Sequence, residues 1–584
     1  MRAIVLMFDS LNRHMVPPFA DLEQELPNFA RLAERTVAFE NFYAGSMPCM
    51  PARRELHTGR QNFLHRSWGP LEPFDDSVPA ILSSRGIHTH LASDHAHYWE
   101  DGGGTYHTRF TTWECFRGQE GDPWKGDVGA TNAQLAPLLR MRQQDAVNRR
   151  YMQTEASHSQ TRTVDAGLEF IDVNAKSDDW MLQIELFDPH EPFFAPERFR
   201  ESRGLDPDAV FDWPAYTRVL ESDEDVQRAR AEYLALLDMC DHSLGRVLDA
   251  MDEHSLWDTT MLIVNTDHGY LLGERGWWAK GMMPWYNELV HLPVYLWDPR
   301  SGERGSRDDR LSQTVDIPLT LLDFFGVEPT SDMTGVSLTS SGDGHDGVLF
   351  GTFGGHVNVT DGRYVYMRSA DHPDNAPLEE YTLMPTHMRA RFSVAELADW
   401  QPAEPFTFTK GVRTMRMAAT GRWLNPWQHG TLLFDLDSDP DQLDPVIDDE
   451  TELRMVRLLV ALMRRGDAPE SQFQRLGLPS AGDVGVEHLR ARDHRDRAMR
   501  VAEPIPREHE LLARDILKMP LGRVLADPRF GDIVARHAPD VAHTEPVALP
   551  PGAGLLLLAA RARIDAETLR AMDRELAAAQ QASR

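Results

Sequence analysis

Short apolar runs alternate with longer amphipathic stretches over roughly the first 370 residues. The apolar runs have the length of buried strands and lie at 3–8, 88–93, 180–187, 260–266, 293–297 and 348–352. Between them, as over 223–252, apolar residues recur at the spacing of one helix face. This alternation predicts an α/β fold in which helices sandwich a large, mostly parallel sheet.

The pattern changes beyond residue 370. Shorter strand-like runs and a helix-like stretch at 452–465 predict a smaller sheet covered by a helix. From residue 481 onward, apolar positions keep helical spacing, but prolines interrupt them. We therefore predict a large α/β domain over 1–370, a smaller α+β domain over 371–480 and a helical extension over 481–584.

The helical extension is too short and too often broken to bury a large core alone. We expect it to pack on another surface, either the large α/β domain of its own chain or a second copy of the chain. A terminal helical arm of this kind predicts a homodimer.

Composition narrows the function classes. Of 584 residues, 60 are Lys or Arg and 91 are Asp or Glu, so the formal charge of −31 repels nucleic acid. The three cysteines are too few for a disulfide framework and favour a reducing compartment. The apolar run after Met1 is too short for a signal peptide, and the run at 555–560 is too short to span a membrane. These features predict a cytoplasmic protein with no nucleic-acid or membrane partner.

Acidic and imidazole side chains follow three of the predicted strands. Asp9 ends the first run, Asp188-Pro-His190 ends the third, and Asp267-His268 ends the fourth. Ligands of an open α/β sheet collect beyond the carboxyl ends of its strands, so we expect one shared site there. Taken singly, each aspartate is also a common turn or helix-cap residue. Together, carboxylate oxygens and a neutral imidazole fit one divalent cation, Ca²⁺, Mg²⁺ or Mn²⁺.

A second motif supplies a nucleophile. Cys49-Met-Pro-Ala-Arg53 is followed by Thr58-Gly59-Arg60. Cysteine phosphatases place an arginine six positions after their cysteine, where this chain has Glu55, so that interpretation is rejected. The motif resembles instead the signature of the type I sulfatases, members of the alkaline phosphatase superfamily. In that family the cysteine is oxidised to formylglycine, and its hydrated aldehyde is the nucleophile, so the resemblance implies a formylglycine-generating enzyme as partner.

The resemblance covers about residues 1 to 465, and its landmarks occur in the expected order. The further segments that are similar to the family are 187–193, 266–274, 278–281, 315–323 and 433–440. The resemblance implies the alkaline phosphatase-like form of the α/β fold. It also implies hydrolysis of sulfate esters in which the alcohol is a small molecule or a saccharide. Aryl sulfates are among the candidate substrates.

The resemblance also implies a role for each site residue. Asp9, Asp267, His268 and the modified Cys49 would hold the cation, and Arg53 would fix the nucleophile loop. Lys280 and His190 would bind the nonbridging oxygens and assist the leaving alkoxide. The family's Lys-x-His step corresponds to His95-Ala96-His97 here, so a histidine replaces the lysine and His97 is the predicted base.

Two departures from the sulfatase pattern widen the range of candidate substrates. Many sulfatases have paired aspartates in the first metal motif, whereas this chain has Asp9-Ser10, and Asp267-His268 replaces the common Asp-Asn. The resemblance then favours the branch of phosphonate monoester hydrolases and promiscuous arylsulfatases. Two alternatives to a sulfatase are therefore kept. One is hydrolysis of phosphonate monoesters or phosphodiesters at the same site, and the other is a noncatalytic binding module.

Two neighbouring segments are candidates for contact with the organic part of the substrate. Aromatic residues flank Lys280 and would either stack on an aryl or sugar group or pack in the core: Trp277, Trp278, Trp285 and Tyr286. The segment 98–106 contains three consecutive glycines and is predicted to be a mobile loop over the pocket.

Overall fold

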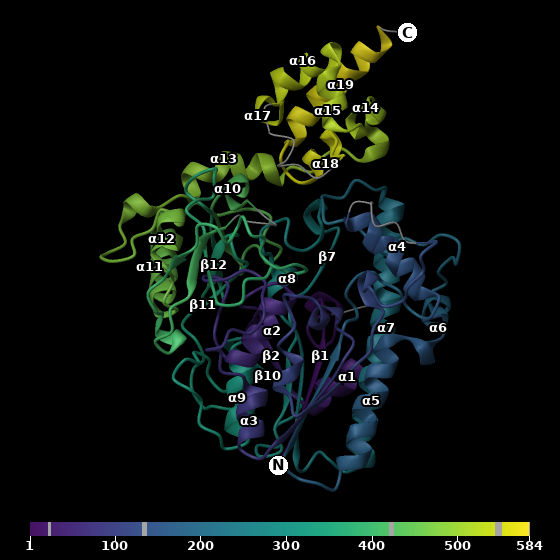
Figure 1. Cartoon of the computed structure of the whole chain (residues 1–584), viewed down its shortest axis with the longest axis vertical. Coiled ribbons are helices and arrows are strands. Elements are labelled where there is room, and N and C mark those ends of the chain that lie inside the picture. The colour runs from purple at the N-terminus through teal and green to yellow at the C-terminus, as the bar shows by residue number, and fades with distance from the viewer. Residues whose placement is uncertain (21–24, 131–136, 420–424, 543–551, 583–584) are drawn as a thin grey trace.

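The computed structural model describes residues 1–20, 25–130, 137–419, 425–542 and 552–582. Its centre is an eight-stranded sheet in the order β10-β2-β9-β6-β1-β5-β3-β4 (Figure 1). The strands, in that order, are Ser306–Gln313, Val37–Tyr43, Tyr295–Trp297, Thr260–Thr266, Arg2–Phe8, Trp180–Leu186, His88–Ser93 and Thr112–Cys115. Among these described strands, β9 alone is antiparallel to its neighbours. The predicted fold class is confirmed.

Side chains of β1 alternate between two apolar layers because successive residues of a strand point to opposite faces. Ile4, Leu6 and Phe8 belong to the core that includes α1 (Pro27–Arg35), α5 (Ser159–Asn174) and α7 (Asp223–Glu253). Ala3 and Val5 belong to the core on the other face. That second face is covered by α2 (Cys49–Thr58), α3 (Val78–Ser84) and α9 (Asp316–Phe324), opposite α5 and α7 in Figure 1.

Two smaller antiparallel sheets follow. The first has the order β11-β12-β13-β17, with strands Val348–Gly351, Val357–Thr360, Tyr364–Arg368 and Leu432–Asp435. The second has the order β14-β16-β15, with strands Glu379–Thr382, Met415–Ala418 and Gln401–Pro402. Strands on both sides of residue 370 therefore share the first of these sheets, and the predicted domain division at that residue stays a prediction. An apolar run such as 348–351 predicts burial but not the sheet that the strand joins.

The first helices of the second half of the chain pack on the four-stranded sheet, and the later helices lie apart from it. α11 (Asp449–Arg465) and α12 (Glu470–Leu476) pack beside the four-stranded sheet, and α13 (Ala491–Ala502) packs on β17 and on α10 (Pro426–His429). The remaining helices are α14 to α19, at Arg514–Lys518, Leu521–Ala526, Pro528–His537, Pro539–Ala542, Leu555–Ala560 and Ala566–Gln581. They form an apolar core of their own and project from the rest of the molecule (Figure 1).

Within the described ranges, every helix is too short or too polar to cross a lipid bilayer.

Candidate active site

Four parallel strands deliver acidic side chains to one edge of the large sheet. Asp9 follows β1, Asp267 follows β6, Asp94 follows β3 and Asp188 lies two residues beyond β5. All four side chains are buried. The parallel strand order β6-β1-β5-β3 puts these carboxyl ends side by side, which is why residues up to 258 positions apart in sequence meet here.

Cys49 is the first residue of α2, so its side chain lies at the positive end of the helix dipole. The turn before it is tied to the same helix by Glu55, whose Oε1 accepts hydrogen bonds from the backbone N–H and the hydroxyl of Ser46. Gly45 is required there, because a Cβ would lie 2.2 Å from a Glu55 oxygen. At the other end, Gly59 caps α2 in the left-handed region with φ 60°. The motif from Cys49 to Gly59 is therefore one complete, capped helix.

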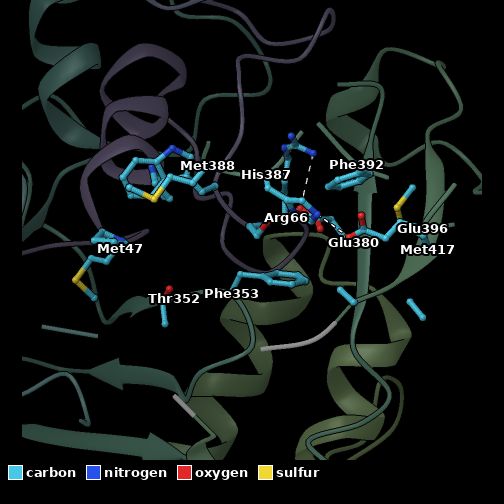
Figure 2. Close-up of a pocket in the computed structure, with 16 residues that line it drawn as sticks. Met47, Arg66, Thr352, Phe353, Glu380, His387, Met388, Phe392, Glu396 and Met417 are labelled. Atoms are coloured by element: carbon cyan, nitrogen blue, oxygen red, sulfur yellow. Dashed lines mark hydrogen bonds and ion pairs between the residues drawn. The ribbon is translucent and has the colours of Figure 1, made fainter. Parts of the chain in front are cut away.

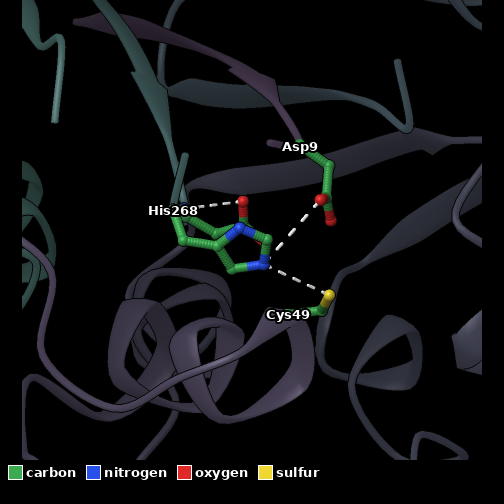
Figure 3. Close-up of side chains that lie close together, drawn as sticks. Asp9, Cys49 and His268 are labelled. Atoms are coloured by element: carbon green, nitrogen blue, oxygen red, sulfur yellow. Dashed lines mark hydrogen bonds and ion pairs between the residues drawn. The ribbon is translucent and has the colours of Figure 1, made fainter. Parts of the chain in front are cut away.

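Ligand atoms of Asp9, Cys49, Asp267 and His268 all lie within 4.8 Å of one another (Figure 3). His268 Nε2 is 3.4 Å from Cys49 Sγ and 3.5 Å from Asp267 Oδ2. Because His268 Nδ1 donates to the Gly269 carbonyl, Nε2 carries the lone pair and faces the other three groups. Burial, and then the charge of Asp9, raises the pKa of the Cys49 thiol. Two carboxylates, a sulfur and an imidazole lone pair on one point are a donor set that fits a divalent cation.

Arg53 joins three carboxylates at the base of the site. Its Nη2 donates to Asp9 at 2.9 Å, its Nη1 to Asp267 at 2.7 Å and its Nε to Glu185 at 2.7 Å. Glu185 also accepts from the hydroxyl of Tyr98 at 2.7 Å. Burial alone would raise the pKa of Asp9, but the charges of Arg53 and Lys280 lower it. The arginine therefore favours the ionised form of Asp9 and fixes the orientation of both candidate metal carboxylates.

Lys280 lies across the site from Arg53. Its Nζ donates to Ser10 Oγ at 2.9 Å and is 3.9 Å from Asp9 Oδ1. Burial would lower its pKa, but the electrostatic influence of Cys49, Glu191 and Asp9 raises it. Ser10 is held in the left-handed region with φ 64°, and its backbone N–H donates to Asp267. The serine therefore links the ammonium to both aspartates.

Three histidines line the same edge. His95 Nε2 is 3.6 Å from Asp9 Oδ2, and the rings of His95 and His97 are 4.8 Å apart. His97 Nδ1 donates to Glu100 at 2.6 Å, which leaves its Nε2 facing Glu120 at 3.6 Å. Burial, and then the charge of Lys280, lowers the pKa of His190, whose Nδ1 donates to the Glu191 carbonyl. His190 therefore presents a neutral ring beside the ammonium.

The structure thus brings together Asp9, Cys49, Arg53, Asp267, His268 and Lys280. His97 reaches that cluster through His95, and the proton-transfer role predicted for it stays a prediction. The sequence analysis missed Glu185 as a partner of Arg53. The signal was available, since Glu185 is a charged residue inside the apolar run Trp180-Met-Leu-Gln-Ile-Glu-Leu186.

The two segments named as candidates for substrate contact are closely packed against other parts of the described chain. Trp278 is buried in the core that includes α7. Trp277, Trp285 and Tyr286 are buried in the apolar core on one face of the sheet, so core packing accounts for them. The glycines of the 98–106 segment serve close packing. A Cβ on Gly102 would lie 2.8 Å from the carbonyls of His387 and Met388 and from the Trp68 ring.

Comparisons with known proteins agree with this geometry. A family model described as Sulfatase matches residues 2–327. The chain is 24% identical over 379 residues to the choline-sulfatase of Rhizobium meliloti, which covers 57% of this chain and 70% of that protein. A solved structure in complex with its substrate D-glucosamine-2-N,6-O-disulfate matches with a TM-score of 0.55 at 14% identity, covering 80% of this chain and 97% of that one. The phosphonate monoester hydrolase of Agrobacterium radiobacter matches with a TM-score of 0.54 at 18% identity, covering 80% and 96%. Both structural matches are matches of fold.

Proposed function

Because this chain belongs to the sulfatase family, we propose that it hydrolyses sulfate esters with a formylglycine formed from Cys49 and one divalent cation. The observation that carries the proposal is the convergence of the ligand atoms of Asp9, Cys49, Asp267 and His268 within 4.8 Å. A scaffold protein would have no need to bury three such donors around one cysteine.

Asp9, Asp267 and His268 would hold the cation together with residue 49. When present, the hydrated aldehyde supplies the nucleophilic hydroxyl and the cation polarises the sulfate oxygens. Arg53 favours the ionised form of Asp9, and its hydrogen bonds fix the orientation of both aspartates. Its third hydrogen bond, to Glu185, anchors the guanidinium to β5 and so preorganises the ligands before substrate arrives.

Lys280 and His190 would bind the nonbridging oxygens of the sulfate group. The ammonium of Lys280 stays charged because negative groups surround it, so it can stabilise charge that develops on those oxygens and on the leaving alkoxide. His190 has a lowered pKa, and its one N–H, on Nδ1, donates to the Glu191 carbonyl, so it would have to gain a proton on Nε2 to donate to an oxygen of the substrate. Ser10 orients the Lys280 ammonium through the 2.9 Å hydrogen bond to its hydroxyl.

His97 is the proposed proton acceptor. Glu100 accepts from its Nδ1, which fixes the tautomer with a free lone pair on Nε2. This pairing of an imidazole with a carboxylate also stabilises the ring once it has gained a proton. The ring would take a proton from the hydroxyl of residue 49 and return one to a leaving group.

The test begins with the nucleophile. Cys49→Ala should abolish turnover of an aryl sulfate and leave the thermal unfolding temperature nearly unchanged, because only one sulfur is removed. Peptide mass spectrometry across residues 49–53 of protein from the native host should show conversion of the thiol to the aldehyde. Activity of the alanine variant within about tenfold of the parent, about 1.4 kcal/mol of barrier, would remove Cys49 from this role.

A second candidate function uses the same residues on phosphonate monoesters or phosphodiesters. It is favoured by Ser10, which stands where a second carboxylate would make the site more negative, and by His268 as a neutral ligand. Sulfate monoesters, phosphonate monoesters and phosphodiesters each carry one negative charge, so charge alone does not select between them. A comparison of kcat/KM on aryl sulfate and aryl phosphonate ester decides which ester is preferred.

The substrate class is proposed more broadly as a small-molecule or saccharide sulfate ester. Choline-sulfatase is among the relatives of this chain, and a disulfated glucosamine is the substrate bound in a protein of the same fold. These two alcohols differ in charge and shape, so the choice between them depends on the residues around the site.

A further inference from the structure

Glu191 is a buried glutamate that directly follows His190 beyond β5. Its side chain is 0% exposed. One carboxylate oxygen, Oε1, accepts a hydrogen bond from the hydroxyl of Tyr216. The other oxygen, Oε2, is buried and has no hydrogen-bond partner among the described residues. A buried carboxylate with a single donor is costly, so this geometry requires a positive or hydrogen-bonding group at Oε2.

Two oxygens of Glu191 face the imidazole ring of His190. The carboxylate Oε2 lies 3.3 Å from His190 Nδ1, and the Glu191 carbonyl accepts the hydrogen bond of the same nitrogen at 2.5 Å. Lys280 acts on the carboxylate through its charge, but the described chain has no direct ion pair between the two. His190 Nε2, on the other side of the ring, forms no hydrogen bond within the described ranges and is left for the substrate.

His190 needs a second proton before it can serve as an acid. In the neutral ring the one proton is on Nδ1, so the ring can give a proton to a leaving alkoxide only after Nε2 has gained one. Burial, and then the charge of Lys280, lowers the pKa of His190 and opposes this imidazolium. A negative group beside Nδ1 offsets both effects.

The carboxyl of Glu191 is suited to that task near neutral pH. Burial raises the pKa of Glu191 to about 7, although the charge of Lys280 lowers it, and Glu120 adds to the rise. Burial, and then the charge of Glu191, raises the pKa of Tyr216 and of Tyr270, so both phenols stay neutral. The carboxyl therefore changes between acid and carboxylate in the working range of most enzymes, and the carboxylate can balance the neighbouring imidazolium.

We propose that Glu191 is a positioning residue for His190: its carboxylate balances the charge of the imidazolium, so that the ring carries a proton on Nε2 and gives it to the oxygen of the leaving alcohol. The inference rests on the proposed sulfatase function and deepens it, because it names the group that makes His190 an acid.

The protons and electrons balance within one turnover. As the bond from sulfur to the leaving oxygen breaks, its electron pair stays on that oxygen, which takes the proton from His190 Nε2. The ring returns to its neutral form with a proton on Nδ1, and Glu191 stays a carboxylate beside it. A proton from solvent then restores the imidazolium before the next ester is cleaved. A carboxylate that pairs with an imidazole stabilises the charged ring in this way in acid–base catalysis.

The first test uses leaving groups that differ in their need for a proton. Nitrophenol leaves readily as its anion, whereas unsubstituted phenol is a weaker acid and leaves more easily when its oxygen is protonated. Glu191→Gln keeps the size and an oxygen for Tyr216 but removes the charge. We expect kcat/KM to fall about 100-fold on phenyl sulfate and less than about threefold on nitrophenyl sulfate, which also shows that the variant is folded. An equal loss on both esters would overturn the assignment, because a purely structural role lowers both alike.

Two further variants locate the effect. Glu191→Asp keeps the negative charge and should have a kcat/KM on phenyl sulfate at least about tenfold above that of Glu191→Gln. Glu396→Gln is the matched control, because Glu396 also pairs with a histidine and accepts from His387 at 2.6 Å. Figure 2 shows this pair in the lining of a pocket of about 220 Å³ to which Glu191 and His190 do not belong. The control should have parent-like rates; a selective loss on phenyl sulfate in it, or no recovery in Glu191→Asp, would contradict the proposal.

Binding of inorganic sulfate gives a readout that does not depend on turnover. Isothermal titration calorimetry at pH 8, in two buffers with different ionisation enthalpies, measures the protons taken up when sulfate binds to the metal-loaded protein. The parent should take up about one proton, because the imidazolium faces the anion, and Glu191→Gln at most about half as much. If the uptake depends on Glu191 but no sulfate ester is cleaved, the proposed function is wrong and the role of Glu191 stands. If esters are cleaved but Glu191→Gln changes neither the uptake nor the difference between the two phenols, the role of Glu191 is wrong.

Discussion

At the scale of single residues, the carboxylates of the site are held in place by donors that come from other elements. Asp267 Oδ1 accepts from the N–H groups of Ser10 and His268, while Oδ2 accepts from Arg53. The orientation of the Asp267 carboxylate is therefore fixed before any ligand binds. Such residues are more sensitive to a change of charge than to a change of volume.

Asp267→Asn should lower metal occupancy and turnover together. The substitution removes one of two carboxylate charges and turns either an NH₂ group or a neutral oxygen toward Arg53. Elemental analysis of the purified protein and the rate on an aryl sulfate should both fall, the rate by about tenfold or more. Asp258→Asn, the same change at an exposed aspartate before β6, is the control. Full metal content in the Asp267 variant would leave this aspartate as a strand-end cap only.

Titration of Glu55 contributes to the pH dependence of the free energy of unfolding. Burial raises its pKa to about 8, despite two hydrogen bonds from Ser46. Between its ordinary value near 4.5 and about 8, the folded protein holds a proton that the unfolded chain releases, so stability falls as pH rises through that window. Glu55→Gln mimics the protonated acid and should remove this part of the slope. The unfolding temperature should therefore drop less between pH 6 and pH 9 in the variant than in the parent; an equal drop in both would show that Glu55 does not titrate there.

At the scale of elements, the 379–419 segment and the segment 98–120 are joined over the candidate base. Arg389 donates to Glu100 at 2.6 Å and to Glu120 at 3.1 Å. Glu100 is the same residue that accepts from His97. Burial alone would raise the pKa of Glu100, but the charges of His97 and Arg389 lower it. Glu120 has a positive φ of 48°, a backbone strain that the surrounding contacts must hold in place.

Arg389→Gln should loosen this junction. Two carboxylates then lose their shared cation, and we expect kcat/KM to fall about tenfold and proteolytic cleavage within 379–419 to become faster. Arg391→Gln changes an exposed arginine of the same segment and is the matched control. Parent-like rates and cleavage in the Arg389 variant would show that the ion pairs do not hold the segment over His97.

The same junction gives the run of glycines in the 98–106 segment a packing role, and the predicted mobility of that segment stays a prediction. Gly103 would place a Cβ 1.9 Å from the His97 carbonyl, and the Gly102 N–H donates to the Met388 carbonyl at 3.0 Å. Glycine here lets two backbones approach closely. A sequence pattern shows that side chains are missing, but not whether solvent or another segment fills the space.

At the scale of the whole molecule, the last helices form a separate unit on a short attachment. Their apolar core begins at Ile505, whereas α13 before it packs on the four-stranded sheet. The described contacts to the large domain include the bond from Arg218 N–H to the Ala560 carbonyl and that from Glu508 N–H to the Leu220 carbonyl. A cut before Ile505 removes the apolar core of the last helices as a whole and, among the described residues, takes Ala562 from the core of the large domain.

Deletion of residues 505–584 should therefore leave a folded protein that still turns over an aryl sulfate. We expect the intact chain to be a homodimer and the truncated chain a monomer with weaker substrate binding, because a terminal helical unit is suited to reach a partner. Size-exclusion chromatography with light scattering measures both. A monomeric parent, or a truncated protein that is still a dimer, would contradict the dimer prediction.

The sequence by itself determined the α/β fold, the family resemblance and the acidic strand ends. These features are local: strand length and helix spacing are written in neighbouring residues, and the spacing from Cys49 to Arg53 places both on the first turns of α2. Parallel strands also end at the same edge of a sheet. The sequence therefore predicts that the residues after these strands share that edge, even when the order of the strands is unknown.

Only the tertiary structure decided which groups support the site. Glu185 and His95 act on Arg53 and Asp9 because β5 lies beside β1 and β3 lies beside β5, an order that no single run of residues encodes. The 379–419 segment reaches Glu100 across 289 residues. The run at 348–352 was predicted to belong to the large parallel sheet, but the strand Val348–Gly351 pairs antiparallel in the four-stranded sheet. The physical reason is the same in each case: burial and periodicity specify that a side chain faces a neighbour, whereas the identity of that neighbour depends on packing between elements distant in sequence.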